Sequence, residues 1–164
     1  MEERPIRLVI ADDNDDARRL ALVTLARLPG FHVLGEAADL AAAAELVARH
    51  LPDVVLLDRA MPGMTGPGAI AALRRRSPAT AVVIVSGYAK EDPRVQSLVG
   101  VVDGYVEKGT SAKALAVAVR RAAARREASP PRPGPAPPPG PPPSLAELAA
   151  ALHDGPVQSL SGAL

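Results

Sequence analysis

The chain of 164 residues has no cysteine and no tryptophan, and its only aromatic residues are one phenylalanine and two tyrosines. Without cysteine, disulfides and thiolate metal sites are excluded, and the composition is typical of a cytoplasmic protein. The core must therefore be built from Leu, Val, Ile and Ala, for which the 48% of apolar residues is sufficient. A chain of this length predicts one domain with appendages.

Long apolar runs and an excess of charge of one sign are also missing. No apolar run approaches the roughly 20 residues that a membrane-spanning helix requires, and the opening MEERP does not resemble a secretory signal. Nineteen basic side chains stand against eighteen acidic ones, a net charge of +1, so no overall field favours nucleic acid or an anionic membrane. We expect a cytoplasmic protein that does not associate with membranes.

Short apolar runs alternate with longer segments of helical period. The expected strands are near Ile6–Ala11, His32–Glu36, Val54–Leu57, Ala81–Val85 and Gly104–Val106. The expected helices are near Asp15–Leu28, Leu40–His50, Gly68–Arg76, Pro93–Val99 and Ala112–Arg126. Continuous apolar strands that alternate with helices predict an α/β fold, a doubly wound five-stranded parallel sheet with helices on both faces.

The first and fifth expected helices each carry an apolar stripe. The stripe of the first consists of Ala17, Leu20, Ala21, Thr24 and Leu28, and that of the fifth of Ala112, Leu115, Ala116, Val119 and Ala123. Arginines 120, 121, 125 and 126 fall outside the second stripe, and Arg74–Arg76 are expected to form a solvated helix end.

The composition changes after residue 127. Positions 129–143 read SPPRPGPAPPPGPPP, and proline cannot donate a backbone hydrogen bond to a helix or a sheet. This segment is expected to be an extended spacer, roughly 45 Å long at about 3.1 Å per residue. The expected division is a domain at 4–127, a Pro-rich linker at 128–143 and a helical tail at 144–164.

The tail reads SLAELAAALHDGPVQSLSGAL. Ser144 and Glu147 can form a capping box at the start of a helix. On a helical projection Leu145, Leu148 and Leu152 then form one apolar stripe.

Polar residues follow four of the five expected strands. Asp12 and Asp13 follow the first strand, Asp58 the third, Ser86 the fourth and Lys108 the fifth. In open α/β sheets ligands bind beyond the carboxyl ends of the strands, so these side chains are expected to meet. Mg²⁺ prefers carboxylate oxygens, and a carboxylate can attack phosphorus to give an aspartyl phosphate. The pattern predicts a pocket for a divalent cation and a phosphoryl group.

Four segments carry a resemblance to a known family: VIADDN (Val9–Asn14), LLDRAMPGMTG (Leu56–Gly66), VIVSGY (Val83–Tyr88) and DGYVEKG (Asp103–Gly109). Over about residues 4–127 the chain resembles the receiver domain of bacterial two-component response regulators. The resemblance implies a flavodoxin-like sheet with the strand order 2-1-3-4-5.

The resemblance also implies roles for the acidic residues. Asp58 would be the phosphoacceptor. Asp13 would be the principal Mg²⁺ ligand, assisted by Asp12 and by Asp58 itself, and the backbone carbonyl of Ala60 would also meet the ion.

Further roles follow from the same resemblance. Ser86 and Lys108 would bind oxygens of the phosphoryl group. Tyr105 would be an aromatic switch that swings inward when Ser86 is drawn toward that group, a two-state equilibrium biased from one end. Simple core packing of Tyr105 is the alternative.

The implied partners are a cognate sensor histidine kinase, which donates the phosphoryl group, and a downstream protein effector. The face formed by the fourth and fifth helices and the fifth strand would change partners, and a homodimer can form through it. No helix-turn-helix segment follows, so direct DNA binding is not supported. No ATP-binding kinase domain is recognisable, so an enzyme is not expected.

The tail segment LHDGPVQSL resembles the phosphoacceptor box of a sensor histidine kinase subfamily. His153 would then be a second phosphoacceptor, and Asp154 would help to deprotonate it. The alternatives are a truncated receiver–histidine kinase hybrid, a phosphorelay intermediate that uses His153, and an inert terminal helix.

Other functions are weighed against a phosphoacceptor. Asp12 and Asp13 can simply cap the following helix. The pair Asp13 and Asp15 faintly resembles haloacid-dehalogenase-type phosphatases, although the rest of that pattern is missing. An adaptor that works without phosphorylation is a third possibility.

Overall fold

The computed structural model describes residues 4–128. The tail resembling a kinase box, with His153 and Asp154, lies outside the described residues, as does the spacer from residue 129 onward. The division of the chain into three parts therefore stays a prediction. Within 4–128 no helix is both long enough and apolar enough to cross a membrane.

Five strands and five helices alternate along the described residues. The strands are β1 (Ile6–Ala11), β2 (Phe31–Ala37), β3 (Val54–Asp58), β4 (Ala81–Ser86) and β5 (Gly104–Glu107). The helices are α1 (Asp15–Ala26), α2 (Leu40–His50), α3 (Pro67–Arg76), α4 (Pro93–Val99) and α5 (Ala112–Ala128). The strands form one parallel sheet in the order β2-β1-β3-β4-β5, which confirms the expected fold.

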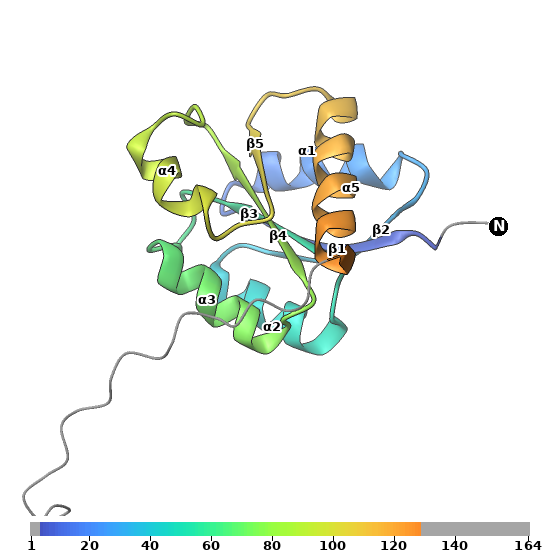
Figure 1. Ribbon diagram of the computed structural model, residues 1–164. Helices are drawn as coiled ribbons and strands as arrows, with labels where there is room; N and C mark the ends of the chain where they lie inside the picture. The colour runs from blue at the N-terminus through green and yellow to red at the C-terminus, as the bar shows by residue number, and fades with distance from the viewer. Residues whose placement is uncertain (1–3, 129–164) are drawn as a thin grey trace, which may run out of the picture.

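Helices cover both faces of the sheet (Figure 1). Successive residues of a strand point to opposite faces, so Val55 and Leu57 pack with α2, α3 and α4, whereas Leu56 packs with α1 and α5. Because both faces are buried, the central strands are apolar throughout. Their carboxyl ends lie along one edge of the sheet, here called the carboxyl edge, and their starts along the opposite amino edge.

The apolar stripes of α1 and α5 are only partly buried. On α1, Leu20 of the stripe keeps 69% of its surface exposed, whereas Leu25, which lies outside the stripe, is fully buried. On α5, Val119 is buried, whereas Leu115 is half-buried and Ala112 is exposed. Both helices therefore pack closely through their C-terminal halves, and their halves near the carboxyl edge leave apolar surface open.

Buried ion pairs join helices and strands at the amino edge. Asp103, just before β5, accepts hydrogen bonds from Arg74 at 2.7 Å and from the backbone N–H of Val82 at 2.8 Å. Arg126 lies 3.8 Å from Asp103 and donates to the carbonyl of Pro78. Arg74 and Arg126 are both buried, so the expectation that Arg74 belongs to a solvated helix end is wrong. The reason is Asp103, which stabilises their charges inside the protein.

Candidate functional site

Asp58 is the last residue of β3, and its side chain is 2% exposed. One carboxylate oxygen, Oδ1, lies 2.9 Å from the ammonium of Lys108, and the other, Oδ2, accepts a hydrogen bond of 3.0 Å from the backbone N–H of Ala60. Lys108 is placed by the sheet, because it follows β5 directly and its backbone N–H donates to the carbonyl of Ser86 at 2.7 Å.

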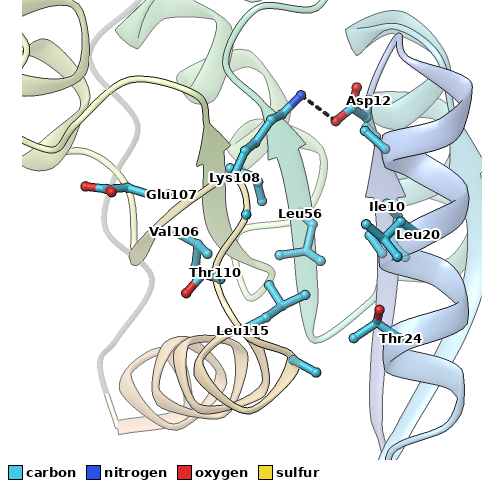
Figure 2. Close-up of a pocket in the computed structure, with 16 residues that line it drawn as sticks. Ile10, Asp12, Leu20, Thr24, Leu56, Val106, Glu107, Lys108, Thr110 and Leu115 are labelled. Atoms are coloured by element: carbon cyan, nitrogen blue, oxygen red, sulfur yellow. Dashed lines mark ion pairs between the residues drawn. The ribbon is translucent and has the colours of Figure 1, made fainter.

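Asp12 follows β1 and is also buried. Its Oδ2 lies 2.8 Å from the ammonium of Lys108, the ion pair drawn in Figure 2. Its Oδ1 accepts the backbone N–H of Asn14 at 2.9 Å, which fixes the loop before α1. Asn14 itself is the N-cap of α1 and accepts from the backbone N–H of Ala17. Asp12 is therefore more than a helix cap, because it is bound to the site lysine.

Three carboxylates come together at the carboxyl edge. Asp12, Asp13 and Asp58 each offer an oxygen, and these oxygens lie within 4.8 Å of one another. Asp13 is exposed, and the other two are buried. Hard oxygen donors at this spacing suit Mg²⁺, which usually keeps several of its own waters. The donor set fits the ion, because the single positive charge of Lys108 does not neutralise three carboxylates, and a divalent cation would balance the remaining negative charge.

Lys108 is charged at this site. Burial lowers the pKa of its side chain, but hydrogen bonds from the ammonium to Asp12 and Asp58, together with their negative charges, outweigh burial and raise that pKa. The ammonium is thus a permanent positive charge between the ends of β1 and β3. It is placed where it can also pair with an anion on Asp58.

Ser86 ends β4 and is 1% exposed. Its hydroxyl oxygen accepts the backbone N–H of Tyr88 at 3.1 Å. The hydroxyl of Tyr105 donates to the carbonyl of Tyr88. Burial raises the pKa of Tyr105, against a smaller opposing effect of a hydrogen bond with Ser86. Tyr105 also packs against the apolar core on the side of α4. Its side chain therefore makes both apolar packing contacts and a polar contact through its hydroxyl.

Arg59 is a site neighbour that sequence reasoning missed. It follows Asp58, and its guanidinium donates to the carbonyl of Met64 at 3.3 Å and to that of Arg94 at 3.4 Å. It therefore ties the loop after the acidic residue to α4. A basic residue directly after the central aspartate was the available signal, but its acceptors are backbone carbonyls of the following loop and of α4, whose positions relative to Arg59 the sequence does not give.

The α4 end of the site has its own cluster of side chains. The guanidinium of Arg94 lies 3.6 Å from the ring centroid of Tyr88, a cation–π contact, and it also hydrogen-bonds Asp92. The side-chain hydrogen bond from Arg94, and then its backbone N–H, lower the pKa of Asp92 to about 2. Tyr88 itself is exposed.

Comparisons with known proteins agree with this geometry. The sequence pattern described as "Response regulator receiver domain" matches residues 8–120. The probable transcriptional regulatory protein NarL of Mycobacterium tuberculosis is 35% identical over 126 residues, covering 77% of this chain and 58% of that protein. Protein-glutamate methylesterase/protein-glutamine glutaminase 3 of Myxococcus xanthus is 37% identical over 89 residues, covering 54% of this chain and 25% of the enzyme. The chain thus spans less than two thirds of either relative.

Solved structures show the same likeness. The signal receiver domain of the putative response regulator NarL from Mycobacterium tuberculosis is 34% identical with a TM-score of 0.62, covering 72% of this chain and 98% of that structure. The response regulator domain of Thermotoga maritima CheB is 26% identical with a TM-score of 0.64, covering 74% and 98%. With the strand order and the acidic cluster at the carboxyl edge, these matches show that the chain belongs to the response regulator receiver domain family.

Proposed function

We propose that the protein accepts a phosphoryl group on Asp58 from a phosphohistidine of a partner histidine kinase, and that the phosphorylated form changes its protein partners. The observation that carries the proposal is the environment of Asp58. Its carboxylate is buried at a strand end, between the ammonium of Lys108 and the backbone N–H of Ala60. A carboxylate in this environment can act as a nucleophile, and the neighbouring ammonium can compensate the negative charge of the phosphoryl group that it receives.

The transfer needs one bond formed and one broken. A carboxylate oxygen of Asp58 bonds to phosphorus while the bond from phosphorus to the imidazole nitrogen breaks, and the electron pair leaves with the imidazole. The Lys108 ammonium is in place to pair with a phosphoryl oxygen. The Ser86 hydroxyl can donate a hydrogen bond to another phosphoryl oxygen.

Asp12, Asp13, Asp58 and the backbone carbonyl of Ala60 are the groups we assign to Mg²⁺. The bound ion would supply positive charge beside the equatorial phosphoryl oxygens. The spacing of the three carboxylates supports this assignment.

The response to phosphorylation would run through Ser86 and Tyr105. The Tyr105 hydroxyl donates a hydrogen bond to the Tyr88 carbonyl and also interacts with Ser86. If the Ser86 hydroxyl rotates to donate to a phosphoryl oxygen, Tyr105 loses its interaction with Ser86. Tyr105 borders α4, and the surface of α4, β5 and α5 would then bind a protein effector or a second copy differently. A cytoplasmic location suits a cytoplasmic kinase partner.

The test is phosphorylation by acetyl phosphate with Mg²⁺, followed by intact-mass measurement. The wild-type chain and an Asp16→Asn control, altered at an exposed acid of α1, should each gain one phosphoryl group, and Asp58→Asn should gain none. The label should survive acid and be lost in base, as an acyl phosphate does. A label that persists in Asp58→Asn, stable in base and labile in acid, would assign the acceptor to His153 instead. Binding of an effector unchanged by Asp58→Asn would favour the phosphorylation-independent adaptor.

A further inference from the structure

An apolar groove opens between α1 and α5, beside the acidic cluster. Its volume is about 420 Å³. Figure 2 shows Leu20 and Thr24 of α1 on one side, Leu115 of α5 on another, and Leu56 of the sheet toward the middle; Ile10 of β1 also lines the groove. Lys108, Gly109 and Thr110 line its end at the carboxyl edge. These residues define the α1–α5 groove.

The groove leaves apolar side chains of α1 and of the sheet exposed or only half-buried. Leu20 is 69% exposed, and Val85 is the only residue of β4 that is not buried, although β4 is paired on both sides. Gly109 has a φ of 87° and no atom within 4 Å of the place where a Cβ would stand, so the end of the groove is open. Apolar surface gathered beside a functional site is typical of a surface that another segment covers.

The charged side chains that line the groove are Asp12, Glu107 and Lys108, all at its carboxyl-edge end. Outside the groove, α5 carries four exposed basic side chains and one exposed acidic one, while α1 carries two of each sign. A second copy placed with its own α5 here would bring like charges together. An apolar segment with acidic side chains and no basic ones would be favoured.

The chain has such a segment beyond its described residues. Positions 144–164 contain Glu147 and Asp154 but no lysine or arginine. The stripe from Leu145 to Leu152 spans eight positions, or seven residue steps, roughly 10 Å as a helix. On α1 the groove residues from Ala17 to Thr24 also span eight positions, so the two stripes match in length.

The spacer is long enough to bring the two together. Helix α5 ends at Ala128, and Leu115 lies thirteen positions earlier, roughly 20 Å along the helix. The Pro-rich positions 129–143 span roughly 45 Å when extended. The tail can therefore turn back along α5 and reach the groove of its own chain.

We propose that the segment Ser144–Leu152 docks in the α1–α5 groove of the same chain. Docking covers the loop Lys108–Thr110 beside Asp58 and occupies the exposed face of α1. The tail thus competes with any protein that approaches the acidic cluster from that side. It needs no phosphoryl group on Asp58 and is independent of the function proposed above.

Because the chain has no cysteine, disulfide trapping tests the docking in the full chain without phosphodonor. Leu20→Cys is combined with Leu148→Cys. The control pair combines Leu148→Cys with Arg75→Cys, an exposed position of α3 near the amino edge, where α5 also ends. By tethering alone the control pair should oxidise at least as fast. Docking instead makes the groove pair form an intrachain disulfide faster, on the order of tenfold, at a rate that does not change on dilution.

A third substitution separates docking from chance collision. Leu145→Asp, added to the groove pair, should lower the rate to that of the control pair, whereas Ala150→Asp, on the opposite side of the expected tail helix, should leave it unchanged. Circular dichroism checks that each variant is folded. Equal rates for groove and control pairs would overturn the proposal. So would disulfide-linked dimers as the main product, which would assign the groove to a second copy.

Discussion

The ammonium of Lys108 lies 2.9 Å from Asp58 and 2.8 Å from Asp12, so one side chain after β5 joins the ends of β3 and β1. Two buried carboxylates so close together would repel each other without a cation. The lysine therefore stabilises the unphosphorylated fold by reducing this repulsion. A metal ion bound to the same carboxylates would reduce it as well.

Replacing Lys108 by alanine should destabilise the protein in the absence of Mg²⁺. We expect a loss of about 1–2 kcal/mol in the free energy of unfolding, less than for a fully buried pair because the lysine side chain is 33% exposed. Mg²⁺ should restore more stability to this variant than it adds to the wild type. Urea denaturation with and without Mg²⁺ measures both effects. The control Lys113→Ala removes an exposed lysine of α5, and an equal response of both variants to Mg²⁺ would contradict the prediction.

Ser86→Ala should slow phosphorylation by acetyl phosphate, whereas Ser86→Thr should keep most of the rate. The alanine variant loses a buried hydroxyl donor, and a hydrogen bond to a charged group contributes about 1.5–3 kcal/mol, so the rate should fall by roughly tenfold or more. Mass spectrometry over time gives the rates. Ser97→Ala, at an exposed serine of α4, is the control, and a normal rate in Ser86→Ala would remove the hydroxyl from the mechanism.

Asp103→Ala should be among the most destabilising single changes in the described domain. It leaves Arg74 and Arg126 buried without the carboxylate and removes the acceptor of the Val82 N–H. We expect a loss of about 3 kcal/mol in the free energy of unfolding. Urea denaturation tests this against Glu45→Ala, a change at an exposed acid of α2. Similar midpoints for the two variants would show that the buried pairs contribute little.

Asp92 should titrate near pH 2 in the folded protein, because Arg94 lowers its pKa to about 2 from an ordinary value of 3.8. A lowered pKa favours the folded state above the ordinary value, so this contribution is present above about pH 4 and is lost as the pH falls from 3.8 toward 2. A carboxyl NMR titration measures it. Arg94→Gln should return the pKa toward 3.8, and Arg75→Gln should not. A titration near 3.8 in the unaltered protein would contradict the prediction.

The fold and the acidic cluster could be read from sequence because both depend on short-range patterns. Continuous apolar runs such as Val54–Leu57 indicate buried strands, and the first polar residue after such a run lies at the edge of a parallel sheet. For this reason Asp12, Asp58 and Lys108 meet as expected. The roles of Ser86 and Tyr105 stay predictions, although the structure places both beside the cluster.

The errors have a common physical origin. Whether a helix residue is buried depends on the distance to the next helix, which the sequence pattern does not contain. Leu20 belongs to an apolar stripe but faces a groove, and Arg74 and Arg126 belong to polar faces but meet Asp103. Arg59 was missed for a similar reason, since its acceptors are the backbone carbonyls of Met64, in the following loop, and of Arg94, in α4.

Arg126 fixes the C-terminal end of α5 at the amino edge through its contacts with Asp103 and Pro78, and the helix begins at Ala112, shortly after Lys108. Helix α5 therefore connects the buried ion pairs at one edge of the sheet with the loop beside the acidic cluster at the other.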